Sequence, residues 1–529
     1  MKILYLLIIC CSLSAMAQQH DAWVFLKQKM YVDAYLANPE TMLSAKALER
    51  RQRQNIAVDV TDVPIAQQYI NQLSNHAQVE IKAKSKWLNA VHVRGELEAI
   101  QSLANLPIVE RLEYADKTIN GKRKKTSGVY TDKWINTESD YGESVNQVQM
   151  LNGHLLHQQG YTGSGVTIAV LDNGYVGVDT AQPFDRLRNE GNLLGGYNFV
   201  ENSENYFSGG THGTRVLSTM AGYTQGALIG AAIDAKYYLF VTEDTTDENP
   251  VEESYWVAAA ELADSLGVDV INTSLGYNYF SNSNYNYTYQ DMNGITTFIS
   301  RGLNMAASKG ILCVNSAGNE GHKDWKYITA PADAQGAFTV GAVTAQGVYA
   351  PFSSIGTSSD GRVKPDVVAQ GVMTVLSDEY GNISHSNGTS FSSPIIAGLM
   401  ACLWQTNLNL TNYELMQKVR QSASLYQNPN EQFGYGIPDF YQAFQNLNNA
   451  QHNSTTLKIY PNPVTDYLAI QSSENDFLKI EMWDMYGKKV LEQEVEGSLT
   501  IPTTTLANGI YIYKINQGGK HILGKIIKQ

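Results

Sequence analysis

The middle of the chain predicts an α/β fold in which a parallel sheet is flanked by helices. Residues 166–171, 268–272 and 311–314 are rich in apolar, β-branched side chains, as is typical of parallel strands buried on both faces. Stretches of helical character lie between them, at 254–265 and 298–308. This alternation predicts βαβ units, whose functional residues gather beyond the carboxyl ends of the strands.

Length and charge indicate several separately folded parts. The 529 residues suffice for three or four domains at about 150 residues each. With 43% hydrophobic and 17% charged residues a disordered chain is excluded, and a net charge of −13 argues against nucleic acid as the main partner. The charge is uneven, because residues 18–130 carry +4, residues 131–452 carry −18 and residues 453–529 are neutral.

The first 17 residues predict a secretory signal peptide. Lys2 precedes an apolar run at 3–13, and Ala15-Met16-Ala17 supplies a small-residue cleavage site. The run is too short to cross about 30 Å of hydrocarbon, although a buried first helix is the alternative. The two cysteines beyond it, Cys313 and Cys402, lie in apolar runs and are expected as small buried side chains rather than as a disulfide.

Residues 18–130 predict a small α+β unit. The pattern indicates strands at 22–26, 79–83, 87–93 and 109–114, with helices at 66–76 and 96–103. The basic run at 122–125 then indicates an exposed, cleavable connection, or alternatively an ordinary solvated linker.

Polar residues with catalytic chemistry follow the predicted strands of the middle segment. Asp172 ends the run at 166–171, and Asn319 follows the run at 311–314. His212 precedes a Gly at the predicted start of a helix. Ser390 precedes an apolar helix, with Pro394 expected in its first turn, so the helix N-terminus would favour developing negative charge at Ser390. A simple Ser N-cap is the alternative.

Together, Asp172, His212 and Ser390 in this chain order, with Asn319 between the last two, resemble the subtilisin family of serine proteases. Ser390 lies in G-T-S-x-x-S-P, and the order differs from those of chymotrypsin-like proteases and α/β-hydrolases. The resemblance implies that Ser390 is the nucleophile and His212 the general base, later the acid. It implies that Asp172 orients the imidazole and that Asn319 and the Ser390 backbone N–H form the oxyanion hole.

The resemblance also implies the substrate contacts. Ser274, Leu275 and Gly276 match the segment that pairs with an extended substrate, and Ala317 with Gly318 matches the opposite wall of the primary specificity pocket. Thr329 is expected near the floor of that pocket, with a broad preference for apolar or medium-sized side chains.

Three segments depart from the family pattern. The segment at 214–217, after His212, lacks the second His that the family usually has there. Residues 221–230 are short, as if the loop that binds calcium in secreted subtilisins were missing, which puts that calcium site in doubt. The resemblance implies no cofactor for catalysis, and the sequence does not decide whether a structural calcium ion binds. The insertion at 277–291 is rich in Tyr and Asn and either extends the substrate cleft or forms a solvated loop.

The last part of the chain predicts a small all-β sandwich after a polar linker at 446–454. Short alternating runs separated by turns fill residues 455–529. This segment resembles the C-terminal sorting domain of type IX secretion cargo, which implies export across a Gram-negative outer membrane; a generic adhesive or carbohydrate-binding sandwich is the alternative. The matching motifs are YPNPV (460–464), MYGK (485–488), LANGIY (506–511) and GKIIK (524–528).

The sequence therefore predicts a signal peptide (1–17), an inhibitory and chaperone-like propeptide (18–130), a subtilisin-like catalytic domain (131–450) and a sorting domain (455–529). The expected function is that of a secreted serine endopeptidase made as a zymogen. Its expected partners are protein or peptide substrates, its own propeptide, whose +4 complements the acidic domain, and the type IX machinery. The alternative is a catalytically silent surface protein that binds through a protease scaffold.

Overall fold

The computed structural model describes residues 18–76, 79–119, 141–454, 457–472, 477–485, 487–517 and 520–529. The expected signal peptide and the basic run at 122–125 lie outside these residues. The chain forms two compact units, 1–443 and 444–529, which are described separately.

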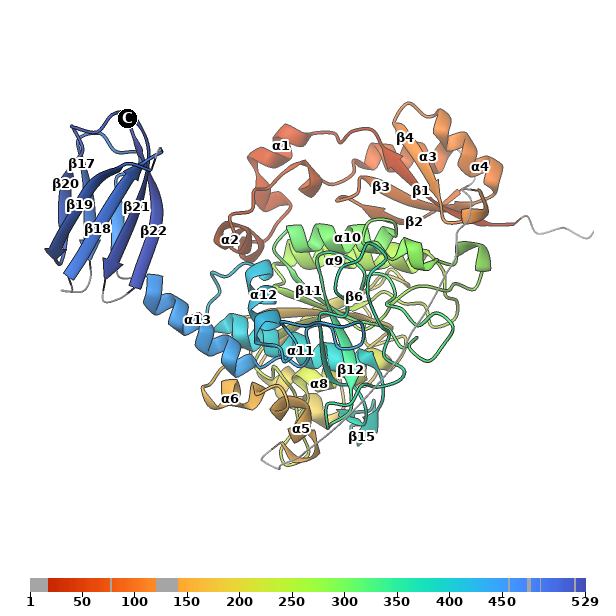
Figure 1. Cartoon of the computed structure of the whole chain (residues 1–529). Coiled ribbons are helices and arrows are strands. Elements are labelled where there is room, and N and C mark those ends of the chain that lie inside the picture. The colour runs from red at the N-terminus through yellow and green to blue at the C-terminus, as the bar shows by residue number, and fades with distance from the viewer. Residues whose placement is uncertain are drawn as a thin grey trace, which may run out of the picture. The chain divides into compact units, whose positions relative to one another are not determined.

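A seven-stranded, all-parallel sheet is the centre of the first unit, so the predicted α/β fold is confirmed (Figure 1). The three apolar runs form its neighbouring strands β5, β10 and β11. In spatial order the strands are β13 (Val367–Gln370), β12 (Ala337–Val343), β11 (Leu312–Ser316), β10 (Val270–Thr273), β5 (Thr167–Asp172), β9 (Lys236–Val241) and β6 (Leu193–Asn198).

Helices cover both faces of this sheet. Figure 1 shows α9 (Val251–Leu266) and α10 (Phe298–Ser308) on one face, and α8 (His212–Ala221) and α11 (Thr389–Gln405) on the other. Helix α11 is buried around its whole circumference, as its apolar sequence requires. It begins at Thr389, so Pro394 lies beyond the first turn, contrary to the sequence prediction.

Shorter elements complete the catalytic part of this unit. Residues 221–230 form a hairpin of β7 and β8, and both Cys313 and Cys402 are buried and unbridged, as expected. The remaining elements are α5 (Val145–Gln149), α6 (Gly153–Gln158), α7 (Asp185–Asn189), α12 (Asn412–Ser422), β7 (Tyr223–Thr224), β8 (Leu228–Ile229), β14 (Thr374–Ser377) and β15 (Ile383–Ser386).

The N-terminal part forms the predicted α+β domain. Its antiparallel sheet has the order β2-β3-β1-β4 and packs on α9 and α10 (Figure 1). Two helices were not predicted, α1 and α2. Helix α1 buries none of its residues, and two of the three residues that α2 buries are arginines, which an apolar pattern does not indicate. The elements are β1 (His20–Leu26), α1 (Val32–Ala37), α2 (Ala45–Arg53), α3 (Gln67–His76), β2 (Val79–Ser85), β3 (Ala90–Gly95), α4 (Leu97–Ser102) and β4 (Val109–Tyr114).

The second unit contains the predicted β-sandwich. A three-stranded sheet, β16-β17-β20, and a four-stranded sheet, β19-β18-β21-β22, enclose an apolar core. The strands are β16 (Leu457–Tyr460), β17 (Tyr467–Ser472), β18 (Phe477–Asp484), β19 (Lys489–Glu496), β20 (Leu499–Pro502), β21 (Gly509–Gln517) and β22 (Lys520–Lys528).

The prediction of a polar linker at 446–454 is wrong, because these residues continue helix α13 (Phe440–Ser454). The stretch contains no Gly or Pro to end the helix that starts at the buried Phe440. Among the described residues, none of the helices has the length and apolar character needed to cross a membrane.

Candidate active site

Asp172 and His212 are brought together at the carboxyl edge of the sheet. Asp172 is the last residue of β5 and His212 the first of α8, and His212 Nδ1 lies 2.7 Å from Asp172 Oδ1. Asn173 fixes the relative position of the two residues, because its backbone N–H donates to Asp172 Oδ1 (2.8 Å) and its side-chain oxygen accepts from the His212 backbone N–H (3.2 Å). This geometry fixes the tautomer of His212 with its proton on Nδ1.

The charge of Asp172 dominates the environment of the imidazole. Asp172 is 1% exposed, and its Oδ2 is buried with no hydrogen-bond partner among the described residues. Burial disfavours the imidazolium, but the charge and hydrogen bond of Asp172 outweigh it, so the pKa of His212 lies above its usual value. The imidazole is thereby made a stronger base.

Ser390 is held at the start of α11 by reciprocal hydrogen bonds with Ser274. Ser390 Oγ donates to the Ser274 carbonyl (3.1 Å), and Ser274 Oγ donates to the Ser390 carbonyl (2.9 Å). The second bond exists because Pro394 has no N–H for the carbonyl four residues before it. Gly388, at φ 153°, permits the turn that leads into the helix.

His212 and Ser390 line the same open cavity of about 500 Å³. The His212 side chain is 34% exposed, and its ring centroid lies 5.7 Å from that of Phe391. Within the described residues no hydrogen bond joins His212 to Ser390, whose hydroxyl is turned to Ser274. Such bonds are often long in unliganded enzymes and form with substrate.

Asn319 lines this cavity too, with its amide orientation fixed. Its Oδ1 accepts from the backbone N–H (2.9 Å) and the hydroxyl (3.0 Å) of Thr389, while Thr389 Oγ1 accepts from the Gly318 N–H (3.3 Å). With the oxygen occupied by two donors, the NH₂ group is left as a donor beside Ser390.

Thr329 lies between the two segments expected to bind substrate. A Cβ added to Gly276 would lie 2.1 Å from Thr329 Oγ1, and one added to Gly318, at φ 105°, would lie 3.0 Å from it. Thr329 is 2% exposed. Leu275 and Ala317 are the direct chain neighbours of these glycines.

The insertion at 277–291 is not a solvated loop. Tyr277, Phe280, Tyr285 and Tyr287 are buried and join the aromatic core that packs against α9 and α10. Tyr277 OH donates to Glu243 (2.6 Å), which anchors the insertion behind the substrate segment.

Sequence reasoning missed several residues of the site. Asn173 and Thr389, which orient His212 and Asn319, are direct chain neighbours of predicted residues, and that adjacency was the available signal. Arg215 had no such signal, because its partner Glu379 (3.2 Å) lies 164 residues away. In the described part of the chain, no group of three or more His, Cys, Asp or Glu side chains could hold a metal ion.

Three family models match the chain. The model described as the subtilase family matches residues 163–436, just over half of the chain. The peptidase S8 propeptide domain of Bacteroidota matches residues 21–142, and the secretion system C-terminal sorting domain matches residues 458–529.

Curated relatives agree with the first match. Subtilisin of Bacillus pumilus is 30% identical over 301 residues, which cover 56% of this chain and 98% of the relative. The thermophilic serine proteinase of Bacillus sp. (strain AK1) is 30% identical over 370 residues, covering 68% and 79%. Subtilisin NAT of Bacillus subtilis subsp. natto is 29% identical over 334 residues, covering 62% and 79%.

Proposed function

Because this chain belongs to the subtilase family, we propose that its serine endopeptidase activity resides in a triad of Asp172, His212 and Ser390. The observation that carries this proposal is the 2.7 Å contact of His212 with the buried Asp172, in the cavity that Ser390 also lines. All three positions hold residues competent for acyl transfer.

The proposed reaction follows from the properties of these groups. Ser390 Oγ attacks the scissile carbonyl while His212 Nε2 takes its proton, and a tetrahedral intermediate forms. The leaving amine then receives this proton from His212, and the C–N bond breaks to leave an acyl-enzyme. Water attacks the ester by the same route, and the proton returns to Ser390. Asp172 stabilises the imidazolium in both halves because its carboxylate is buried and faces Nδ1–H.

Asn319 and the backbone N–H of Ser390 are proposed as the oxyanion hole. The hydrogen bonds that Asn319 Oδ1 accepts from Thr389 support this role. They fix the orientation of the Asn319 NH₂ group in advance, so no reorganisation is needed when the oxyanion forms. The N-terminus of α11 adds a favourable dipole for the developing negative charge.

The substrate is proposed to lie as an extended strand between Ser274–Leu275–Gly276 and Ala317–Gly318. Thr329 fills the space between Gly276 and Gly318, which supports a shallow pocket for small or medium-sized side chains. The proposed chemistry uses no cofactor, so activity should persist in EDTA; a structural calcium ion would appear instead as a loss of thermal stability in EDTA.

The protein is a zymogen peptidase, because a propeptide domain precedes the catalytic domain. We propose that cleavage between about residues 116 and 145 releases the catalytic domain, and N-terminal sequencing of the mature protein would locate the bond.

Replacing Ser390 by Ala tests the proposed activity. The variant should lose casein hydrolysis and labelling by a fluorophosphonate probe, whereas Ser392→Ala, a buried neighbour on α11, should retain both. Unchanged casein hydrolysis in Ser390→Ala would refute the triad. A wild-type protein that the probe leaves unlabelled would favour the alternative of a silent binding protein.

The C-terminal sorting domain indicates secretion or display on the outer surface. We propose that a signal peptide at 1–17 directs the chain to the periplasm of a Gram-negative cell and that the type IX system then exports it. Deletion of residues 455–529 should trap the protein in the periplasm, and normal export of the shortened chain would refute this route.

A further inference from the structure

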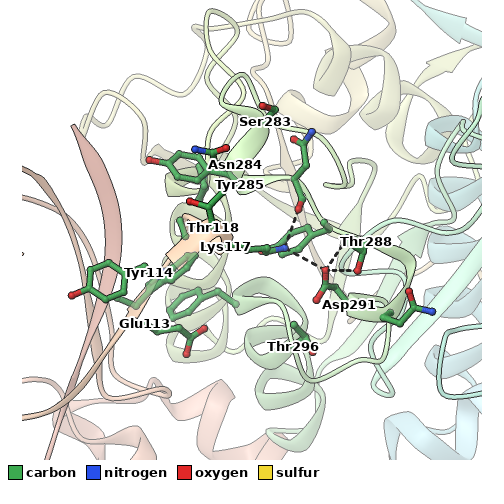
Figure 2. A pocket seen from close by; sticks show the side chains of 17 residues that line it. Glu113, Tyr114, Lys117, Thr118, Ser283, Asn284, Tyr285, Thr288, Asp291 and Thr296 are labelled. Carbon is green, nitrogen blue, oxygen red and sulfur yellow. Dashed lines mark hydrogen bonds and ion pairs between the residues drawn. The ribbon is translucent and has the colours of Figure 1, made fainter. Parts of the chain in front are cut away.

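A cavity of about 790 Å³ in the first unit lies between the insertion at 277–291 and the end of the propeptide (Figure 2). The propeptide contributes residues 113–115 and 117–118, at and after the end of β4, while the insertion contributes residues 283–288 and 290–291. The mechanism proposed above makes no use of this cavity, and neither triad nor oxyanion residues line it.

One propeptide side chain, Lys117, extends into this cavity toward the insertion (Figure 2). Its Nζ lies 3.4 Å from the centroid of the Tyr287 ring, donates to the Asn286 carbonyl (3.3 Å) and lies 3.4 Å from Asp291 Oδ2. An ammonium group over an aromatic face, with a carbonyl and a carboxylate at its sides, has the partners that an alkylammonium ion requires. Burial lowers the pKa of Lys117, and Asp291 opposes that effect.

The three partners of Lys117 are held by the catalytic domain and not by the propeptide. Asp291 Oδ2 accepts from the backbone N–H (2.7 Å) and hydroxyl (2.9 Å) of Thr288, in a capping box at the end of the insertion. Tyr287 is buried, and its hydroxyl donates to Glu253 of α9. These partners are therefore held by bonds within the catalytic domain that do not involve Lys117.

The neighbouring propeptide residue makes a second contact with the insertion. Asn284 Nδ2 donates to Asp116 Oδ2 (3.2 Å), and Asp116 Oδ1 accepts from the backbone N–H (2.9 Å) and hydroxyl (2.6 Å) of Thr118. This turn fixes the direction in which Lys117 leaves the backbone.

We propose that Asn286, Tyr287 and Asp291 form a binding site for an alkylammonium side chain, the lysine site, and that Lys117 occupies it in the precursor. The insertion thereby recognises the propeptide segment that leads toward the expected cleavage region. This inference deepens the zymogen part of the proposed function and does not depend on the catalytic roles of the triad.

The test uses the full-length precursor with Ser390→Ala, which keeps the chain uncleaved. Hydrogen exchange of the amides in 113–119 and 283–291 is measured for Lys117→Met and for Asp291→Asn, since Asn keeps an acceptor for Thr288 but removes the charge. Each variant should exchange about 10-fold faster in both segments. Lys27→Met, at an exposed lysine of the same domain, should change neither segment.

The double variant Lys117→Met/Asp291→Asn should exchange no faster than Lys117→Met alone, because Lys117→Met already removes the ion pair that Asp291→Asn disrupts. Exchange within twofold of the parent in Lys117→Met, or additive effects in the double variant, would overturn the proposal. If Lys117→Met also lost protection from exchange in β1, the proposal would be overturned as well. Lys117 would then be needed for folding of the propeptide rather than for its binding to the insertion. The intact mass of the precursor shows whether it is uncleaved, and exchange is compared only in uncleaved protein, so failure here is distinct from failure of the proposed triad.

Discussion

Replacing Asp264 by Asn tests how the propeptide is held at the amino-terminal edge of the sheet, away from the proposed active site. Asp264 lies in the last turn of α9, and its carboxylate binds two arginines of the propeptide helix α2. Arg50 contacts Asp264 Oδ1, and Arg51 lies 2.7 Å from Oδ2. The side chains of Arg50 and Asp264 are 0% exposed, so this ion pair is withdrawn from water.

The size of the expected effect follows from the contacts that Arg50 and Arg51 keep when the charge of Asp264 is removed. Arg51 keeps Asp62 at 2.9 Å. Among the described residues, Arg50 keeps hydrogen bonds only to the backbone carbonyls of Val268 and Lys309, with Asp269 as a nearby negative charge that does not pair with it directly. Breaking a buried pair on one side costs roughly 3–5 kcal/mol, because a buried charge is left without its counter-charge. At 1.4 kcal/mol per factor of ten, local opening of α2 should become about 10²- to 4 × 10³-fold more frequent.

Hydrogen exchange of the α2 amides in the Ser390→Ala precursor measures this opening directly. Glu49→Gln is the matched control, since Glu49 is 64% exposed and lies 3.9 Å from Arg53, a surface pair worth about 0.5 kcal/mol or less. The apolar pair Arg50→Met/Asp264→Leu should restore most of the protection. If Asp264→Asn changed exchange no more than Glu49→Gln, the reasoning from burial would be refuted.

Three further predictions concern the proposed active site. Because Asp172 raises the pKa of His212 and the base must be neutral, kcat/KM should rise with pH through a pKa above the usual histidine value. Asp172→Asn should move this rise of kcat/KM to lower pH and reduce kcat about 10⁴-fold. If the rise stayed at the same pH, the proposed pairing of Asp172 with His212 as the base would be contradicted. Asn319→Leu should lower kcat about 10²–10³-fold with little change in KM, by analogy with the corresponding residue of subtilisin, whereas a change confined to KM would argue against an oxyanion role. Thr329→Gly should shift preference toward larger side chains before the scissile bond, measured with a peptide series, and an unchanged preference would place Thr329 outside the pocket.

Much of the fold could be predicted from the sequence because the signals are local. The apolar runs that became β5, β10 and β11 are short and continuous, and burial on both faces leaves a clear pattern. Helix α10 and strand β4 have the bounds that their periodicity indicates. The helical continuation through 446–454 was missed because polar composition was taken to indicate a linker, although no residue there ends a helix.

The candidate triad and Asn319 could likewise be predicted, because each lies next to a strand end or helix start with a distinctive local motif. The partner that orients Ser390 required the tertiary structure. The bond of Ser274 to the Ser390 carbonyl joins residues 116 apart, and nothing in either segment signals the other.

The sequence by itself determined the α/β sheet, the order of the candidate catalytic residues, the basic domain before the acidic one and the sandwich at the end. Local patterns suffice for these features, because strands, helices and turns are selected by neighbouring residues. Only the tertiary structure decided that Arg50 and Arg51 share Asp264, that Thr329 lies between Gly276 and Gly318, and that Lys117 meets the insertion. These pairings depend on how whole elements pack together. A charged or aromatic side chain needs a specific partner only when folding has removed it from water.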